Sequence, residues 1–280
     1  MDLSIIIINH NTKALTAQTI QSIFDTNPQI AYEIIVVDNS NLAEETYTEK
    51  QAGVTILSNV DNKGFAHGCN TGAAIAQGEY LLFLNSDTIM QPDTLDASVA
   101  YMHKHANIGA LGVQVVLPDG SLDHACKRGF PTPWNALCYF SHLDRLFPKM
   151  ALFNGYRLNH LNRNEIHRVD VITGAYMMMP AKLYQELSGF DETYFMYGED
   201  IDLCWRIKAA GHDIVYYAPV TCLHLKGQSG RASQNAVVQY HFYNAMLIFY
   251  DRYYVGRYPR WLTGIIKWAI RKKMPQTGGV

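Results

Sequence analysis

The sequence has no apolar run long enough to cross a bilayer, since its longest runs fall far short of the ~20 residues that a spanning helix needs. No two of the five cysteines have CxxC spacing, which argues against a zinc site or a disulfide scaffold and indicates reduced thiols. The N-terminus begins with a strand pattern and shows no basic segment followed by a cleavage site. We therefore expect a cytoplasmic protein.

The sequence also has no excess of positive charge. Lys and Arg total 23 against 25 Asp and Glu, and the formal net charge is −2. A protein that binds nucleic acid by neutralising phosphates needs clustered basic residues, so we expect no nucleic-acid partner. The length of 280 residues fits one large α/β domain, or such a domain with an appendage.

The first 115 residues alternate short runs rich in Ile, Val and Leu with helical patterns. Continuous apolar strands alternating with helices indicate a parallel sheet that is covered on both faces, as in Rossmann-like folds. The predicted strands are 3–9, 33–38, 54–58 and 80–84. The predicted helices lie near 14–26, 43–52 and 67–76.

Three of these strands end in polar residues. The segments are Asn9-His10-Asn11, Asp38-Asn39-Ser40 and Asn85-Ser86-Asp87. Ligands of parallel sheets collect at the carboxyl ends of strands, so this shared position predicts a nucleotide pocket. The Asn-x-Asp turn after residue 84 also suits a hard cation with oxygen ligands. Helix caps and turns remain the alternative for each segment taken singly.

A second acidic segment lies more than a hundred residues further along the chain. Glu199, Asp200 and Asp202 fall in the first turn of a predicted helix. A carboxylate placed there can act as a general base, although acids in a first turn also complement the helix dipole.

The remaining segments are less regular. Residues 116–168 contain turn signals and an aromatic stretch, and we assign them no structure. Residues 169–180 predict a strand containing a glycine turn, followed by a helix near 181–187. From Arg252 to Lys273 the chain carries seven basic residues and no acidic one, between aromatic and Ile side chains. This composition is typical of an interfacial amphipathic helix, or of a terminal helix packed on its domain.

Together these segments resemble glycosyltransferase family 2 over roughly residues 3–230, and within it bacterial rhamnosyltransferases. The resemblance implies an α/β GT-A fold: a Rossmann-like, mostly parallel central sheet flanked by helices, here with a C-terminal helical amphipathic extension. Residues 1–115 would form the nucleotide-sugar-binding half, and 116–235 the acceptor-binding and catalytic half of the same domain. Residues 236–280 would form the basic, aromatic extension.

The resemblance also implies roles for single residues. Asp87 and His224 would be metal ligands and Asp200 the catalytic base. The family usually has aspartate where Asn85 stands, so Mn²⁺ or Mg²⁺ would bind mainly with the donor phosphates present. The residues expected to bind the donor nucleotide are Asn9, Asn11, Asp38, Lys63, Gly64, Asn70, Asn85 and Ser86. The residues expected to support the acceptor or the active site are Glu199, Asp202, Trp205 and Arg206.

The implied activity is inverting, metal-dependent transfer of a sugar from a dTDP- or UDP-sugar to a hydroxyl of a glycan or polyprenyl-linked acceptor, in cell-surface polysaccharide synthesis. The sugar we expect is L-rhamnose from dTDP-rhamnose. We expect peripheral contact with the inner membrane face through residues 252–273. Two alternatives stay open: a nucleotidyltransferase, which typically opens with a glycine-rich basic loop that Ser4 to Asn11 lacks, and a noncatalytic nucleotide-sugar-binding module.

Overall fold

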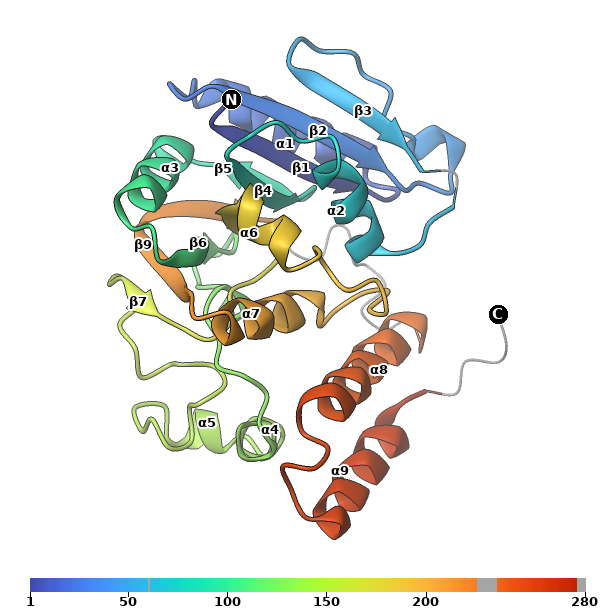
Figure 1. The fold of residues 1–280 in the computed structure, drawn as a ribbon, viewed down its shortest axis with the longest axis vertical. Helices are drawn as coiled ribbons and strands as arrows, with labels where there is room; N and C mark the ends of the chain where they lie inside the picture. The colour runs from blue at the N-terminus through green and yellow to red at the C-terminus, as the bar shows by residue number, and fades with distance from the viewer. Residues whose placement is uncertain (60, 226–235, 276–280) are drawn as a thin grey trace.

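The computed structural model describes residues 1–59, 61–225 and 236–275. One mixed sheet runs in the order β3-β2-β1-β4-β8-β6-β9-β5, with β7 paired to β9 (Figure 1). The strands are β1 (Leu3–Asn9), β2 (Tyr32–Asp38), β3 (Val54–Ser58), β4 (Tyr80–Asn85), β5 (Thr88–Met90), β6 (Ile108–Val116), β7 (His167–Arg168), β8 (Tyr176–Pro180) and β9 (Asp213–His224). Strands β1 to β4, β6 and β9 share one direction, which confirms the expected mostly parallel sheet.

Some helices of the described residues flank this sheet, and the others lie apart from it (Figure 1). The helices are α1 (Lys13–Asp25), α2 (Phe65–Ala73), α3 (Thr94–Lys104), α4 (Pro133–Phe140), α5 (Leu143–Leu146), α6 (Ala181–Glu186), α7 (Glu199–Ala209), α8 (Ala236–Tyr253) and α9 (Arg260–Lys273). Helix α2 packs on β1 and β2, whereas α3 and α7 pack on β6 and β9. None of the helices in the described residues is long and apolar enough to cross a membrane.

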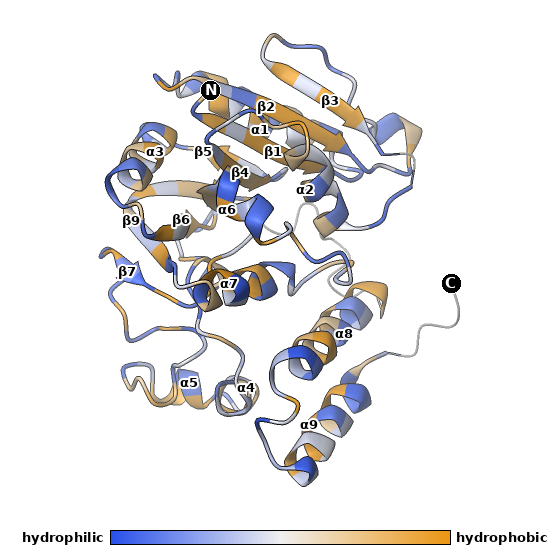
Figure 2. Cartoon of the chain, viewed as in Figure 1, coloured by the Kyte–Doolittle hydropathy of each residue, from blue (hydrophilic) through white to orange (hydrophobic). Residues whose placement is uncertain are grey.

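The central strands are continuously apolar because they lie in the core of the protein. Every residue of β1 is buried, and so are the last five of β2, because helices and loops cover both faces of the sheet. Figure 2 shows these central strands as predominantly hydrophobic, while the surrounding helices alternate hydrophobic and hydrophilic stripes. Burial of this apolar surface is the main force that holds the sheet together.

Strand register brings the polar strand ends together. Asn9 pairs with Asp38 across β1 and β2, and its neighbour Ile8 pairs with Asn85 across β1 and β4. All three polar residues therefore lie at the same edge of the sheet, as the sequence predicts. This edge forms the floor of the candidate site.

The helix expected near residues 43–52 is wrong. Only a single 3₁₀ turn forms there, at Ala43–Glu45. The backbone carbonyl of Glu45 accepts hydrogen bonds from Asn9 Nδ2 at 2.9 Å and from Ser40 Oγ at 3.2 Å. Side chains thus engage the carbonyl that a continuing helix would use, which is a local competition that periodicity does not reveal.

The C-terminal extension consists of two helices. Helices α8 and α9 lie together beside α7 and away from β1 to β4 (Figure 1). Phe249, Tyr250 and Tyr254 form a small buried cluster that packs against Trp205 of α7. The extension is therefore anchored to α7.

Candidate active site

The two acidic segments meet in one cavity. It has a volume of about 1130 Å³ and reaches from the polar edge of the sheet to α4, α8 and α9. Its described wall includes Gly64, Asn85, Ser86, Asp87, Glu199, Asp200 and His224. The cavity thus brings together residues that are more than a hundred positions apart in the sequence.

A pair of carboxylates holds His224 in this wall. Strand β5 pairs antiparallel with the end of β9, and this pairing sets Thr88 opposite His224. His224 Nε2 lies 3.1 Å from Asp87 Oδ1, and its Nδ1 lies 3.1 Å from Asp123 Oδ2. Burial opposes protonation of the ring, yet the bonds to Asp123 and Asp87 raise the pKa of His224 to about 9. Without a metal, the ring is therefore cationic at neutral pH.

This arrangement fits a divalent cation that binds with the donor. Asp87 Oδ1 and His224 Nε2 lie 3.1 Å apart, and a carboxylate oxygen and an imidazole nitrogen are both atoms that could hold Mn²⁺ there. Asp123 on the other ring nitrogen is the partner that orients a metal-binding histidine. Within the described residues, no three His, Cys, Asp or Glu side chains could hold an ion by themselves. Further ligands would have to come from the donor phosphates or water.

Asp200 forms an ion pair with Arg128. Arg128 Nη2 donates to Asp200 Oδ2 at 2.5 Å, and both side chains are only 12% exposed. The same guanidinium also donates to the carbonyls of Ala125 and Ile172, at 3.1 and 3.2 Å. Three acceptors fix its position, so it fixes the orientation of the Asp200 carboxylate. The sequence offers no signal for this partner, because Arg128 lies in a segment without periodicity.

Glu199 stands beside Asp200 in a different state. Its side chain is buried, and its Oε2 has no hydrogen-bond partner among the described residues. Burial, and then the negative charge of Asp200, raises the pKa of Glu199 to about 8. The raised pKa favours the protonated form of Glu199, and in that form the carboxyl can donate a hydrogen bond.

Asn9 and Asp38 lie beneath the cavity and outside its described wall. Asn9 Nδ2 donates to Asp38 Oδ1, Ser40 Oγ and the Glu45 carbonyl, at 2.5, 2.8 and 2.9 Å. Its Oδ1 accepts from the hydroxyls of Thr12 and Thr16 at 3.1 and 2.8 Å. This amide uses all of its hydrogen-bonding capacity within the protein, so it builds the floor.

Asn11 and Asn70 join segments of the chain near the site. Asn11 Nδ2 donates to Asn41 Oδ1 at 2.6 Å. Asn70 Nδ2 donates to the Phe190 carbonyl at 2.9 Å, and its Oδ1 accepts from Tyr184 at 2.5 Å. Lys63 is exposed on the surface. His10 and Asn39, from two of the polar strand ends, line the cavity together with Thr12 and Asn62. None of these four is among the residues that were expected to bind the donor.

Gly64 brings two distant segments into contact. Its φ of +100° is accessible mainly to glycine, and an added Cβ would stand 2.3 Å from the carbonyl oxygen of Phe195. That oxygen accepts a hydrogen bond from Phe65 N at 3.0 Å. The first turn of α2 is thereby fastened to the loop that leads into Glu199 and Asp200.

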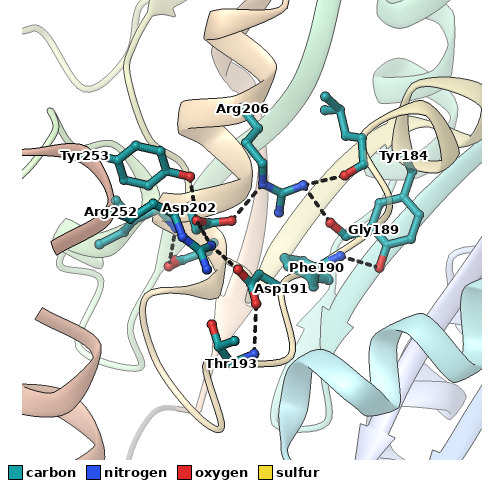
Figure 3. A network of polar contacts seen from close by, with 12 residues as sticks. Tyr184, Gly189, Phe190, Asp191, Thr193, Asp202, Arg206, Arg252 and Tyr253 are labelled. Carbon is teal, nitrogen blue, oxygen red and sulfur yellow. Dashed lines mark hydrogen bonds and ion pairs between the residues drawn. The ribbon is translucent and has the colours of Figure 1, made fainter. Parts of the chain in front are cut away.

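Asp202 anchors the C-terminal helices (Figure 3). The carboxylate is fully buried and accepts from Arg206 Nε at 2.8 Å, Arg252 at 3.0 Å and the Tyr253 hydroxyl at 2.6 Å. Arg252 also pairs with Asp191. None of Asp202, Trp205 and Arg206 belongs to the described cavity wall. Asp202 and Trp205 contact α8, whereas Arg206 donates to the carbonyls of Leu187 and Gly189 at 2.7 and 2.9 Å.

The chain is similar in sequence to a known family of enzymes. The family model described as "Glycosyltransferase like family 2" matches residues 2–241. The chain is 25% identical over 261 residues to the rhamnosyltransferase WbbL of Escherichia coli, covering 85% of this chain and 88% of that protein. It is 27% identical over 194 residues to N-acetylglucosaminyl-diphospho-decaprenol L-rhamnosyltransferase of Mycobacterium tuberculosis, covering 69% of this chain and 60% of that protein.

Two solved structures show the same fold at low identity. GalNAc-T7, crystallised with UDP, GalNAc and Mn²⁺, is 18% identical with a TM-score of 0.59 over 80% of this chain and 43% of its own. The mannosyltransferase PcManGT of Pyrobaculum calidifontis, in complex with GDP-Man and Mn²⁺, is 16% identical with a TM-score of 0.56 over 87% of this chain and 62% of its own.

The Asp202 network generates a stability prediction. Asp202→Asn should lower the free energy of unfolding by about 3 kcal/mol, because Arg206 loses its charged partner in a buried site. The matched control is Asp170→Asn, since Asp170 pairs with Lys208 at an exposed position. The control should cost less than about 1 kcal/mol. Urea unfolding of both variants measures the difference, and equal losses would show that the buried network is not the anchor.

Proposed function

The chain belongs to glycosyltransferase family 2 and is a nucleotide-sugar glycosyltransferase, and we propose that it is metal-dependent and inverting. The proposed reaction moves L-rhamnose from dTDP-rhamnose to a hydroxyl of a glycan or lipid-linked glycan in cell-surface polysaccharide synthesis. The observation that carries this proposal is the cavity in which the Asp87 and His224 pair shares a wall with the Asp200 and Arg128 pair.

The names of two relatives support the sugar and the acceptor. Both the E. coli and the M. tuberculosis protein are named as rhamnosyltransferases. The name of the second also specifies an acceptor sugar linked through diphosphate to decaprenol. A dTDP-rhamnose donor and a polyprenyl-linked acceptor are therefore the substrates that we propose.

The donor half of the reaction would use residues 1–115 together with His224. Asp87 and His224 would hold Mn²⁺ or Mg²⁺, and the ion would offset the charge that grows on the departing diphosphate. Gly64, Asn85 and Ser86 line the cavity and would contact the donor directly. Asn9 and Asp38 would support the donor from below by fixing the sheet edge.

The acceptor half would use Asp200 as general base. Asp200 would take the proton from the acceptor hydroxyl as that oxygen attacks the anomeric carbon, on the face opposite the leaving diphosphate. Arg128 would position the carboxylate through the contact at Oδ2. Glu199, whose raised pKa favours the protonated form, would donate a hydrogen bond to the acceptor.

Helix α9 supports a peripheral membrane contact through residues 252–273. Its side chains Trp261, Ile265 and Trp268 are 68%, 55% and 60% exposed and recur at helical spacing on one face. Arg271, Lys272 and Lys273 follow in the last turn. Exposed Trp and Ile beside basic residues suit the interface of an anionic bilayer. We propose that this face rests on the cytoplasmic side of the cell membrane.

The metal role predicts that Asp87→Asn nearly abolishes transfer and Mn²⁺-dependent binding of dTDP, with the fold retained. The variant removes the charged member of the Asn85-Ser86-Asp87 turn. The converse change, Asn85→Asp, adds a second carboxylate and should strengthen Mn²⁺ binding in the absence of dTDP. Titration calorimetry with and without Mn²⁺ measures both effects. Unchanged metal-dependent binding in Asp87→Asn would reject the metal role.

The base role predicts that Asp200→Asn keeps donor affinity and lowers kcat by ~10²-fold or more, as expected for the loss of a general base. Steady-state kinetics and dTDP calorimetry on the same preparation separate the two quantities. Parallel losses in donor affinity and turnover would instead make Asp200 a binding residue.

The membrane contact predicts loss of binding when the last turn of α9 is neutralised. Replacing Arg271, Lys272 and Lys273 by Gln should weaken sedimentation with phosphatidylserine liposomes by ~10²-fold, since each basic residue near such a surface contributes about 1 kcal/mol. The control replaces three lysines outside the C-terminal extension, Lys50, Lys104 and Lys182, and should bind as the unaltered protein does. If the unaltered protein does not sediment with these liposomes at low salt, the membrane contact is refuted.

A further inference from the structure

Beyond Asp200, the cavity changes from polar to apolar. Its continuation is lined by Phe140 of α4, Phe242 and Met246 of α8, and Ile266 and Ile270 of α9. We call these residues and the space between them the apolar arm. Among the described residues of the wall, α4, α8 and α9 contribute no Asp, Glu, Lys or Arg side chain. A sugar or a phosphate would find no charged partner there, whereas a hydrocarbon chain would gain from leaving water.

The arm begins next to the segment that carries the proposed base. The Phe242 ring lies edge-on to that of Tyr197, with the ring centroids 6.1 Å apart. Ala245 of α8 packs close to Gly198, where an added Cβ would stand 3.1 Å away. Both contacts border the turn that leads into Glu199 and Asp200. A molecule lying along the arm would thus place one end at the catalytic carboxylates.

The same helices that line the arm carry exposed apolar side chains on their outer surfaces. On α4 these are Trp134 and Leu137, and on α9 they are Trp261 and Trp268. Lys273 Nζ stands 4.6 Å from the centre of the Phe140 ring, which joins the end of α9 to α4. The two outer surfaces therefore adjoin at the entrance of the arm.

Basic side chains outnumber acidic ones on this surface. Residues 131–162 and 252–275 contain one acidic residue, Asp144, which is buried beside Arg157. Asp251, at the end of α8, pairs with Lys267 of α9 at 2.6 Å. Exposed basic residues include Arg145, Lys149, Arg260 and Arg271. Apolar side chains among an excess of cations complement an anionic bilayer. The arm thus connects a membrane-compatible surface with the catalytic carboxylates.

We propose that the apolar arm holds the first isoprene units of a polyisoprenyl diphosphate that carries the acceptor sugar, while the rest of the chain stays in the bilayer. This inference rests on the proposed function for the position of the sugar, but its evidence is the lining of the arm. It assigns α4, α8 and α9 to recognition of the lipid, in addition to their packing role. A partly enclosed tail would also set the depth at which the sugar meets Asp200.

A photoreactive probe tests the position of the tail. The probe is farnesyl diphosphate with a diazirine at the end of its chain, used with the full-length protein, and labelled residues are mapped by mass spectrometry. The label should fall on α4, α8 and α9, and unlabelled farnesyl diphosphate should displace it. Inorganic diphosphate and dihexanoyl phosphatidic acid should not. Labelling elsewhere would overturn the inference, and equal displacement by the phosphatidic acid would overturn the polyisoprenoid assignment.

A matched pair of substitutions gives an independent test. Ile266→Trp fills the arm and should weaken farnesyl diphosphate binding by about tenfold or more in calorimetry. Ile75→Trp makes the same change at an exposed position outside the cavity wall and should leave binding unchanged. If Ile266→Trp does not fold, Met246→Trp replaces it. Equal affinities of the unaltered protein and the arm variant would contradict the inference.

Hydrolysis of dTDP-rhamnose by the unaltered protein separates this inference from the proposed function. If farnesyl diphosphate binds in the arm but the protein shows no Mn²⁺-dependent hydrolysis of the donor, the lipid role of the arm stands and the proposed donor chemistry is rejected. If the protein hydrolyses the donor but binds farnesyl diphosphate no more tightly than inorganic diphosphate, the lipid role of the apolar arm is rejected and the donor chemistry stands.

Discussion

The pairing of β5 with the end of β9 is the contact on which the site depends. It sets His224 opposite Thr88, and it also lets Leu225 N donate to the Asp87 carbonyl at 2.8 Å. A shift of one residue in this register would turn the His224 side chain to the other face of the sheet. Because β9 also pairs along β6, the rigid centre of the sheet fixes the position of the imidazole. The spacing of the two metal-binding candidates is therefore a property of the backbone ladder.

Helix α7 shows how environment divides the roles of similar residues. Its first turn carries Glu199, Asp200 and Asp202. Glu199 has an unpartnered oxygen and an elevated pKa, Asp200 has Arg128, and Asp202 has Arg206, Arg252 and a tyrosine hydroxyl. Desolvation and local charge thus leave one acid protonated, orient the second towards the cavity and commit the third to packing.

The anchor of the C-terminal helices and the candidate base are two residues apart on α7. Asp202 accepts hydrogen bonds from Arg252 and Tyr253, so α8 is held to the helix that carries Asp200. Both α8 and α9 complete the cavity wall. Helices α8 and α9 therefore belong to the same packed unit as the helix that carries Asp200, an arrangement that would suit the proposed membrane-held acceptor.

The local pattern of apolar and polar residues in the sequence was enough to determine the central strands and the polar edge of the sheet. Continuous apolar runs predicted β1, β2 and β4, because burial on both faces demands them, and polar strand ends predicted the edge that forms the floor of the cavity. Only tertiary structure decided which of the polar residues reach the cavity. The Asn9 amide bonds within the protein beneath the cavity, and Asp202 holds α8. Arg128 contacts Asp200, and Asp123 contacts His224, although no periodic pattern marks either Arg128 or Asp123. A hydrogen-bond partner more than seventy residues away is set by strand pairing and loop packing, and neither leaves a local signal in the sequence.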